Sequence, residues 1–144
     1  MSAEINFYLR DGKYGWLSNF HRAKQVCHEI EYPTNEHFYQ SRKAKDEKVA
    51  GWIASAPTPF LAMCAGRCLR RKELRDDWDK EGIMHFGLIA KFEQNEDLKQ
   101  KLLATGNAVI HEDSPTDMFW GKRGKDMLGK LLMMVRKEIR DREG

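Results

Sequence analysis

The stretch YPTNEHFYQSRKA, residues 32–44, predicts the point at which a strand gives way to a helix. Thr34 follows Pro33 and suits the N-cap position, because its hydroxyl can accept a hydrogen bond from a free amide of the first turn. We therefore expect a helix from Thr34 to about Asp46. Its first turn carries Glu36, where a buried helix ordinarily carries alanine or leucine. A carboxylate at such a position is unusual unless it caps the helix or serves a function.

The chain on either side of residues 32–44 contains short alternating runs. Residues 5–9 alternate apolar and polar side chains and are followed by Asp11-Gly12, which predicts a strand closed by a turn. Residues 26–32 alternate in the same way, so we expect a second strand that pairs with the first. A third short strand can form at residues 107–111, NAVIH.

Most of the remaining chain has helical spacing of apolar residues. The segment DSPTDMFWGKRGKD, residues 113–126, is expected to be a loop, because Pro115, Gly121 and Gly124 interrupt any regular pattern. The predicted fold class is α+β, predominantly helical, with a small β element in a single compact domain over residues 1–144. Further helices are expected at residues 49–56, from Thr58-Pro59, at 84–92, from Asn95 to Gly106, and from Asp126 onward.

Composition narrows the class of protein. A chain of 144 residues has the size of one ordinary domain. No apolar run approaches the roughly 18 residues that a membrane helix needs, and no secretory signal is visible, so we expect a cytoplasmic protein without a membrane partner. Three cysteines without a CxxC pair argue against a disulfide framework and a zinc knuckle. We expect Cys64 and Cys68 to be buried thiols.

Metal and thiol chemistry are both disfavoured by residue spacing. Glu36 and His37 are adjacent and so diverge by about 100 degrees on a helix, and no HExxH pair brings two imidazoles to one face. His85 and His111 could join from elsewhere, but their spacing does not require it. The apolar flanks of Cys64 favour the core over a nucleophile. The sequence therefore predicts neither a metal nor another cofactor.

Two carboxylates lie beside aromatic residues and are candidates for chemistry. Glu36 is equally suited to a helix cap and to a catalyst, because first-turn carboxylates are favoured by the helix dipole alone. Asp117, in TDMFWG, is a residue type common in turns. Together they suit cleavage of a sugar from a flat ring, where a carboxylate stabilises an oxocarbenium-like transition state. The residue types do not distinguish this N-glycosidase chemistry from simple binding.

Six stretches resemble one known family, in that family's order and over nearly the whole chain. Each alone is a weak signal, but all six in order are highly specific. The chain resembles the NADAR superfamily (NAD- and ADP-ribose-associated), especially its bacterial YbiA-type N-glycosidases. The stretches are YGWLSNF, YPTNEHFYQSRKA, WDKEGIM, KFEQNEDLKQKLLATG, DMFWG and LGKLLMMVR.

The resemblance implies a mainly helical domain with a small β component, and it implies site residues. Glu36 matches the glutamate of the family's EHxYQ motif, and Asp117 matches the aspartate of its DxxWG motif, so both are expected to be catalytic. The basic run from Arg67 to Arg75 favours a solvated face over a phosphate site when it is taken by itself. Every substrate that the family suggests carries phosphate, so the resemblance implies that some of the basic side chains face the pocket. The expected substrate-binding residues are Trp78, Trp120, Asn19, Phe20, Gln40, Arg67 and Lys91, with Arg70 and Arg71 as further phosphate candidates.

Three functions follow from the resemblance. The first is hydrolysis of the N-glycosidic bond in ribosylamino-pyrimidine phosphate intermediates of riboflavin biosynthesis, with a small ribosyl phosphate as partner. The second is removal of ADP-ribose from guanine in ADP-ribosylated nucleic acid. The third is a non-catalytic ADP-ribose-binding module. Asp126 stands where the family often has asparagine, and we expect it to cap the last helix while losing an amide donor.

Overall fold

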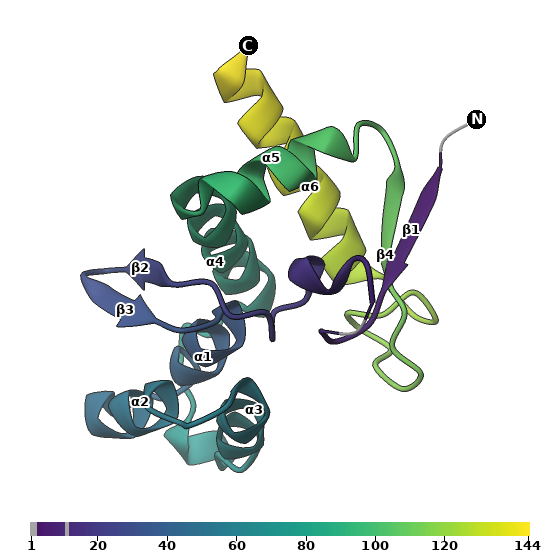
Figure 1. Cartoon of the computed structure of the whole chain (residues 1–144). Helices are drawn as coiled ribbons and strands as arrows, with labels where there is room; N and C mark the ends of the chain where they lie inside the picture. Colours follow the sequence, from purple (N-terminus) through teal and green to yellow (C-terminus); the bar gives the residue numbers. More distant parts are fainter. Residues whose placement is uncertain (1–2, 11) are drawn as a thin grey trace. The chain divides into compact units, whose positions relative to one another are not determined.

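The computed structural model describes residues 3–10 and 12–144, and within these residues it is mainly helical with two small sheets (Figure 1). This confirms the predicted class. The helices are α1 (Asn35–Ser41), α2 (Glu47–Ala54), α3 (Pro59–Arg67), α4 (Lys80–Gln94), α5 (Glu96–Ala104) and α6 (Met127–Glu143), with short 3-10 turns η1 (Gly15–Leu17) and η2 (Arg71–Glu73). The strands are β1 (Glu4–Phe7), β2 (Gln25–Cys27), β3 (Ile30–Tyr32) and β4 (Val109–Glu112).

The chain folds as two units. One holds the segment up to His21 together with Phe92–Gly144, and the other holds Arg22–Lys91. The first contains the β1-β4 sheet with α5 and α6, and the second contains the β2-β3 hairpin with α1, α2 and α3. A single domain over residues 1–144 stays a prediction.

The strand pairing differs from the expectation. β1 runs parallel to β4, with Glu4 opposite Val109, and the predicted pairing of residues 5–9 with 26–32 is wrong. Residues 26–32 form most of an antiparallel hairpin, because His28 and Glu29 turn the chain with φ angles of 52 and 69 degrees. Two-residue hairpin turns usually carry Asn-Gly or Asp-Gly. Because His28-Glu29 continues the alternating pattern instead, the sequence did not indicate a turn there. Asp11, half of the other predicted turn, lies outside the described residues.

The helix starts in the second unit agree with the sequence. Thr34 Oγ1 accepts a hydrogen bond from the amide of His37 at 3.1 Å, which fixes the first turn of α1. This helix ends at Ser41, short of the predicted end, with Arg42 as its C-cap. Asp46 instead begins α2, where it accepts from the Lys48 amide at 2.7 Å. Thr58 caps α3 as predicted.

The first unit contains α6, and the apolar stripe of this helix is buried as predicted. The N-cap of α6 is Asp126, whose backbone adopts the left-handed conformation with a φ angle of 54 degrees. Its side chain makes no capping hydrogen bond, contrary to the prediction, and lies 2.5 Å from His111 Nδ1 instead. The buried residues of the stripe are Leu128, Leu131, Leu132, Val135 and Ile139.

The cysteines are less uniformly buried than predicted. All three are free thiols, and Cys27 is buried. Cys64 is partly buried, but Cys68 is exposed, so the expectation of a buried thiol is wrong there. Cys68 is the C-cap of α3, where the helix leaves the core.

Candidate active site

Glu36 occupies the first turn of α1 with only 7% of its surface exposed. Its Oε2 accepts a hydrogen bond of 2.6 Å from Nε2 of Gln40, one turn further along the helix. Gln40 is itself 3% exposed. A carboxylate held by a buried amide is fixed in position, and this is the property that a catalytic carboxylate requires.

His37 lies beside Glu36 in sequence but has a structural role. Its Nε2 lies 2.9 Å from the carbonyl of Ala56 and its Nδ1 lies 2.7 Å from Thr34 Oγ1. The carbonyl can only accept, so Nε2 donates to it, and in the neutral ring Nδ1 accepts from the hydroxyl. Burial lowers the pKa of His37, which favours this neutral form. The imidazole therefore joins α1 to the chain just beyond α2, and Glu36 stays the candidate for chemistry in this turn.

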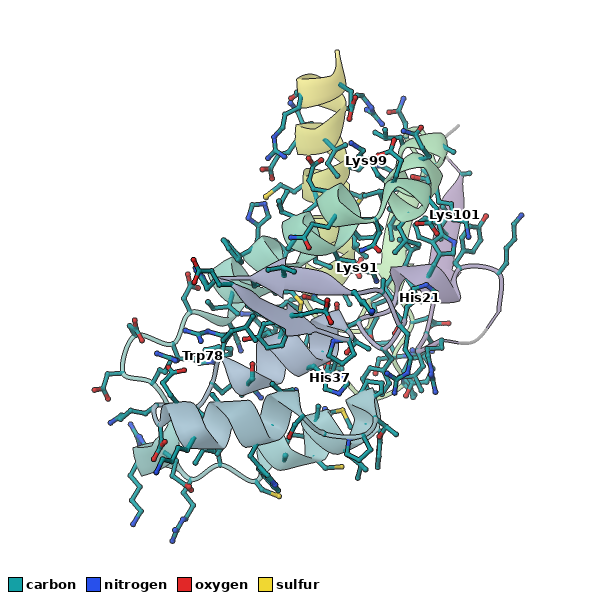
Figure 2. All side chains as sticks on the ribbon, turned by 60° about the vertical axis from the view of Figure 1, so that its left-hand side comes forward. His21, His37, Trp78, Lys91, Lys99 and Lys101 are labelled. Atoms are coloured by element: carbon teal, nitrogen blue, oxygen red, sulfur yellow. The ribbon has the colours of Figure 1, made fainter. Side chains whose placement is uncertain are left out.

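Aromatic rings follow Glu36 along the same face. Tyr39, 6% exposed, meets Trp78 edge to face, with ring centroids 5.2 Å apart. Trp78 is partly buried in the segment before α4, and Figure 2 labels it together with His37. Trp78, which is expected to bind substrate, thus packs against Tyr39 on the helix that carries Glu36.

Gln40 is positioned by the neighbouring helix α3. A Cβ atom on Gly66 would overlap the Oε1 of Gln40 and come within 2.8 Å of its Cδ. Because Gly66 has no side chain, the Gln40 amide has the space that it needs to hydrogen-bond to Glu36. Arg67, the next residue, is exposed in the last turn of α3.

Gly66→Ala is expected to lower kcat about tenfold or more and to lower the melting temperature by several degrees. The new methyl group displaces a flexible amide, so Glu36 loses a hydrogen bond to its charged oxygen, an interaction worth about 1.5 to 3 kcal/mol. Steady-state kinetics beside thermal unfolding measures both quantities. Gly51→Ala on α2 is the matched control, because a Cβ there meets nothing within 4 Å. Equal kcat in Gly66→Ala and Gly51→Ala would contradict the positioning role of Gln40.

Asp117 has a structural role that the sequence had left open. Its Oδ1 accepts hydrogen bonds from the amides of Phe119 and Trp120, at 3.0 and 2.9 Å. Ser114 Oγ in turn accepts from the Asp117 amide at 2.9 Å. The carboxylate thus shapes the 113–126 loop and presents Trp120, which lies edge to face with Phe119. A catalytic role for Asp117 stays a prediction.

The other expected residues are distributed between the two units. Asn19, 8% exposed, and Phe20 lie with Asp117 and Trp120 in the first unit, and Lys91 is at the end of the second. Lys91 is fully buried on α4, and burial lowers the pKa of its amine to about 7. Because the Lys91 amine is often neutral near pH 7, it is a weak partner for the expected phosphate group. A neutral amine is better suited to proton transfer or to nucleophilic attack.

That Lys43 lies near Glu36, and Lys80 near Lys43, was not predicted from the sequence. The Nζ of Lys43 lies 5.3 Å from the centroid of the Tyr39 ring. Burial lowers the pKa of Lys43, and the charges of Glu36, Arg67 and Lys80 act on it as well. The available signal was spacing, because residues 36, 39 and 43 are three and four apart and share one face of a helix.

The described part of the chain contains neither a membrane-spanning helix nor a cluster of metal-ligating side chains. No helix there is both long and apolar enough to cross a membrane. Residues 3–10 and 12–144 place no group of three His, Cys, Asp or Glu side chains where they could hold a metal ion.

The chain belongs to the NADAR domain family, whose profile matches residues 6–140. N-glycosidase Npun_R5314 of Nostoc punctiforme is 41% identical over 95% of this chain and 93% of its own length. N-glycosidase YbiA of Escherichia coli is 39% identical over 94% of this chain and 88% of its own. The NMR structure of E. coli YbiA matches with a TM-score of 0.88 and 37% identity, covering 99% of this chain and 89% of that one.

A longer relative bears another name. Riboflavin biosynthesis protein VVA0006 of Vibrio vulnificus is 33% identical over 98% of this chain, which corresponds to 40% of the Vibrio protein. The predicted family is thus confirmed, and the names of the full-length relatives confirm the prediction of a hydrolase acting on N-glycosyl bonds.

Proposed function

We propose that this protein hydrolyses the N-glycosidic bond of a ribosylamino-pyrimidine phosphate in riboflavin biosynthesis. Two full-length relatives are named N-glycosidases, and a longer relative is named for riboflavin biosynthesis. A cytoplasmic location is part of the proposal, because three free thiols suit a reducing compartment.

The observation that carries the proposal is the buried carboxylate of Glu36, held by Gln40 at 2.6 Å beside the Tyr39–Trp78 pair. In the reaction the bond from the anomeric carbon to nitrogen breaks, and its electron pair leaves with the amine. Positive charge develops on the ribose and is stabilised by the Glu36 carboxylate. Water supplies the new hydroxyl at the anomeric carbon, and its second proton goes to the amine. The aromatic rings suit stacking of the flat base.

The substrate is tested by offering the purified protein three compounds in parallel. These are a ribosylamino-pyrimidine phosphate, an ADP-ribosylated guanosine and free ADP-ribose. We expect mass spectrometry to detect ribose phosphate and free amine from the first compound. Release of ADP-ribose from the second alone would assign the protein to removal of ADP-ribose from guanine. Binding of ADP-ribose without turnover of either would make it a binding module.

Chelation is expected to leave the hydrolysis rate unchanged. The sequence lacks ligand spacing for a metal, and the proposed chemistry uses a carboxylate and water. Rates are measured before and after dialysis against EDTA, with the protein's melting temperature as the control for integrity. A rate that disappears and returns with one divalent ion would contradict the expectation.

A further inference from the structure

Lys43 lies close enough to interact with Glu36 and with two further cations, Arg67 and Lys80. Lys43 continues the helical spacing of Glu36 and Tyr39 just beyond α1, where its amide donates to the Gln40 carbonyl at 3.2 Å. Its amine stands over the Tyr39 ring and is half-buried. Arg67 ends α3, and Lys80 begins α4 two residues after Trp78. Arg67 and Lys80, from two further elements of the second unit, thus lie near Lys43, which itself interacts with Glu36.

These charges interact with one another. Burial lowers the pKa of Lys43, Glu36 acts in the opposite direction, and both Arg67 and Lys80 lower it further. The side chains of Lys43 and Arg67 form no hydrogen bond or ion pair with any residue that the structure describes. The fold therefore holds these positive charges close together, and their repulsion costs free energy. Among the described residues, no ion pair offsets this cost at Lys43 or at Arg67.

Four of the neighbouring carboxylates are engaged with other groups. Asp79 accepts a hydrogen bond from the Gly82 amide at 3.1 Å and so caps the start of α4. Three more carboxylates neutralise cations that lie close in sequence to Lys43, Arg67 and Lys80. These pairs are Lys45–Asp76 at 3.3 Å, Arg70–Glu73 at 3.3 Å and Arg75–Glu47 at 2.6 Å.

We infer that Lys43, Arg67 and Lys80 form a binding site for a phosphoryl group of the substrate, beside the aromatic pair and two helical turns from the catalytic carboxylate. The inference rests on the proposed function for the identity of the substrate. Its chemical class is a phosphate ester or a diphosphate, in which the anion is separated from the anomeric carbon by the rest of the sugar. An arginine supplies a fork for two oxygens, and lysines supply point charges.

Binding is tested first without any reaction. Ribose 5-phosphate is titrated into the wild-type protein and into Lys43→Met by calorimetry at low salt, where charge contacts are least screened. Methionine keeps the length of the chain over Tyr39 but removes its charge. We expect about a tenfold weaker affinity in Lys43→Met and in Arg67→Gln. Lys43→Arg, which keeps the charge, is expected to bind almost as wild type.

The paired cations provide matched controls. Lys45→Met and Arg70→Gln remove the same charges within the same region, but from side chains already paired with Asp76 and Glu73. We expect their affinities to stay within about twofold of wild type. Equal losses in the paired and unpaired variants would overturn the site, because a diffuse basic surface would then explain binding. Unchanged affinity in Lys43→Met would overturn it as well.

A kinetic comparison separates this inference from the proposed function. In Lys43→Met, KM is expected to rise about tenfold for the phosphorylated substrate and to stay unchanged for its dephosphorylated form. Turnover with unchanged KM would overturn the phosphate site and leave the proposed function standing. Phosphate binding that depends on Lys43, without turnover of any substrate, would support the site and reject the proposed function. Comparing ribose 5-phosphate with ADP-ribose shows whether a monoester or a diphosphate binds.

Discussion

Replacing Glu36 with glutamine is expected to lower kcat by about 10² to 10⁴ while the fold survives. Glutamine keeps the size of the side chain and can still face Gln40, but it cannot stabilise a developing cation or activate water. The helix loses only its dipole term, about 0.3 to 1 kcal/mol. Steady-state kinetics, thermal unfolding and binding of an unreactive substrate analogue measure the three consequences, and binding is expected to persist.

Glu96→Gln is the matched control for this substitution. Glu96 also lies in the first turn of a helix and also accepts from a glutamine four residues on, Gln100, at 3.0 Å. It differs in being exposed on α5. Normal turnover in Glu96→Gln beside a large loss in Glu36→Gln would assign the effect to the buried site. Near-normal turnover in Glu36→Gln would reduce Glu36 to a helix start and leave Asp117 as the catalytic candidate.

Lys91→Met is expected to be more stable than wild type below pH 7, and this difference in the free energy of unfolding is expected to be larger there than at alkaline pH by on the order of 5 kcal/mol. The pKa of Lys91 is about 7 in the fold, against an ordinary value of 10.5. Between these values the unfolded chain binds more protons, so wild-type stability rises with pH across this window. The advantage of Lys91→Met therefore narrows from pH 7 toward 10.5.

Chemical denaturation at several pH values measures this advantage. Altered packing around the methionine changes the free energy of unfolding by an amount that does not follow the titration, so the pH dependence is the readout. Lys101→Met on α5 is the control, since Lys101 is exposed (Figure 2). A simultaneous loss of turnover would show that Lys91 is retained for function at a cost in stability. A stability difference independent of pH would contradict the depressed pKa.

Local signals predicted much of the helical part of the fold. Thr34 and Thr58 were recognisable as caps because the hydroxyl must precede the turn that it serves. The parallel pairing of β1 with β4 was not predictable, since it joins segments about a hundred residues apart in sequence and depends on tertiary packing. The turn at His28 and Glu29 was hidden because neither residue is a usual hairpin turn type.

In the candidate site, too, local sequence predicted some features, while others depend on tertiary packing. Glu36 and Gln40 were found through a motif, and their hydrogen bond follows from helical spacing. The function of Gly66 was invisible, because it depends on α3 packing against α1. Lys43 resembles any surface lysine until its position over Tyr39 is known. Pairing also separates Arg70 from Arg67, which look equivalent in a basic run but differ in whether a carboxylate neutralises them.

The most direct test of the account is a progress curve for the ribosylamino-pyrimidine phosphate with wild-type protein and Glu36→Gln in parallel. Mass spectrometry follows ribose phosphate and free amine. The account predicts that wild-type protein releases both products in equal amounts and far in excess of the protein added, while Glu36→Gln releases them at least about a hundredfold more slowly. Intact substrate in the presence of wild-type protein, or equal progress curves for the two proteins, would contradict it.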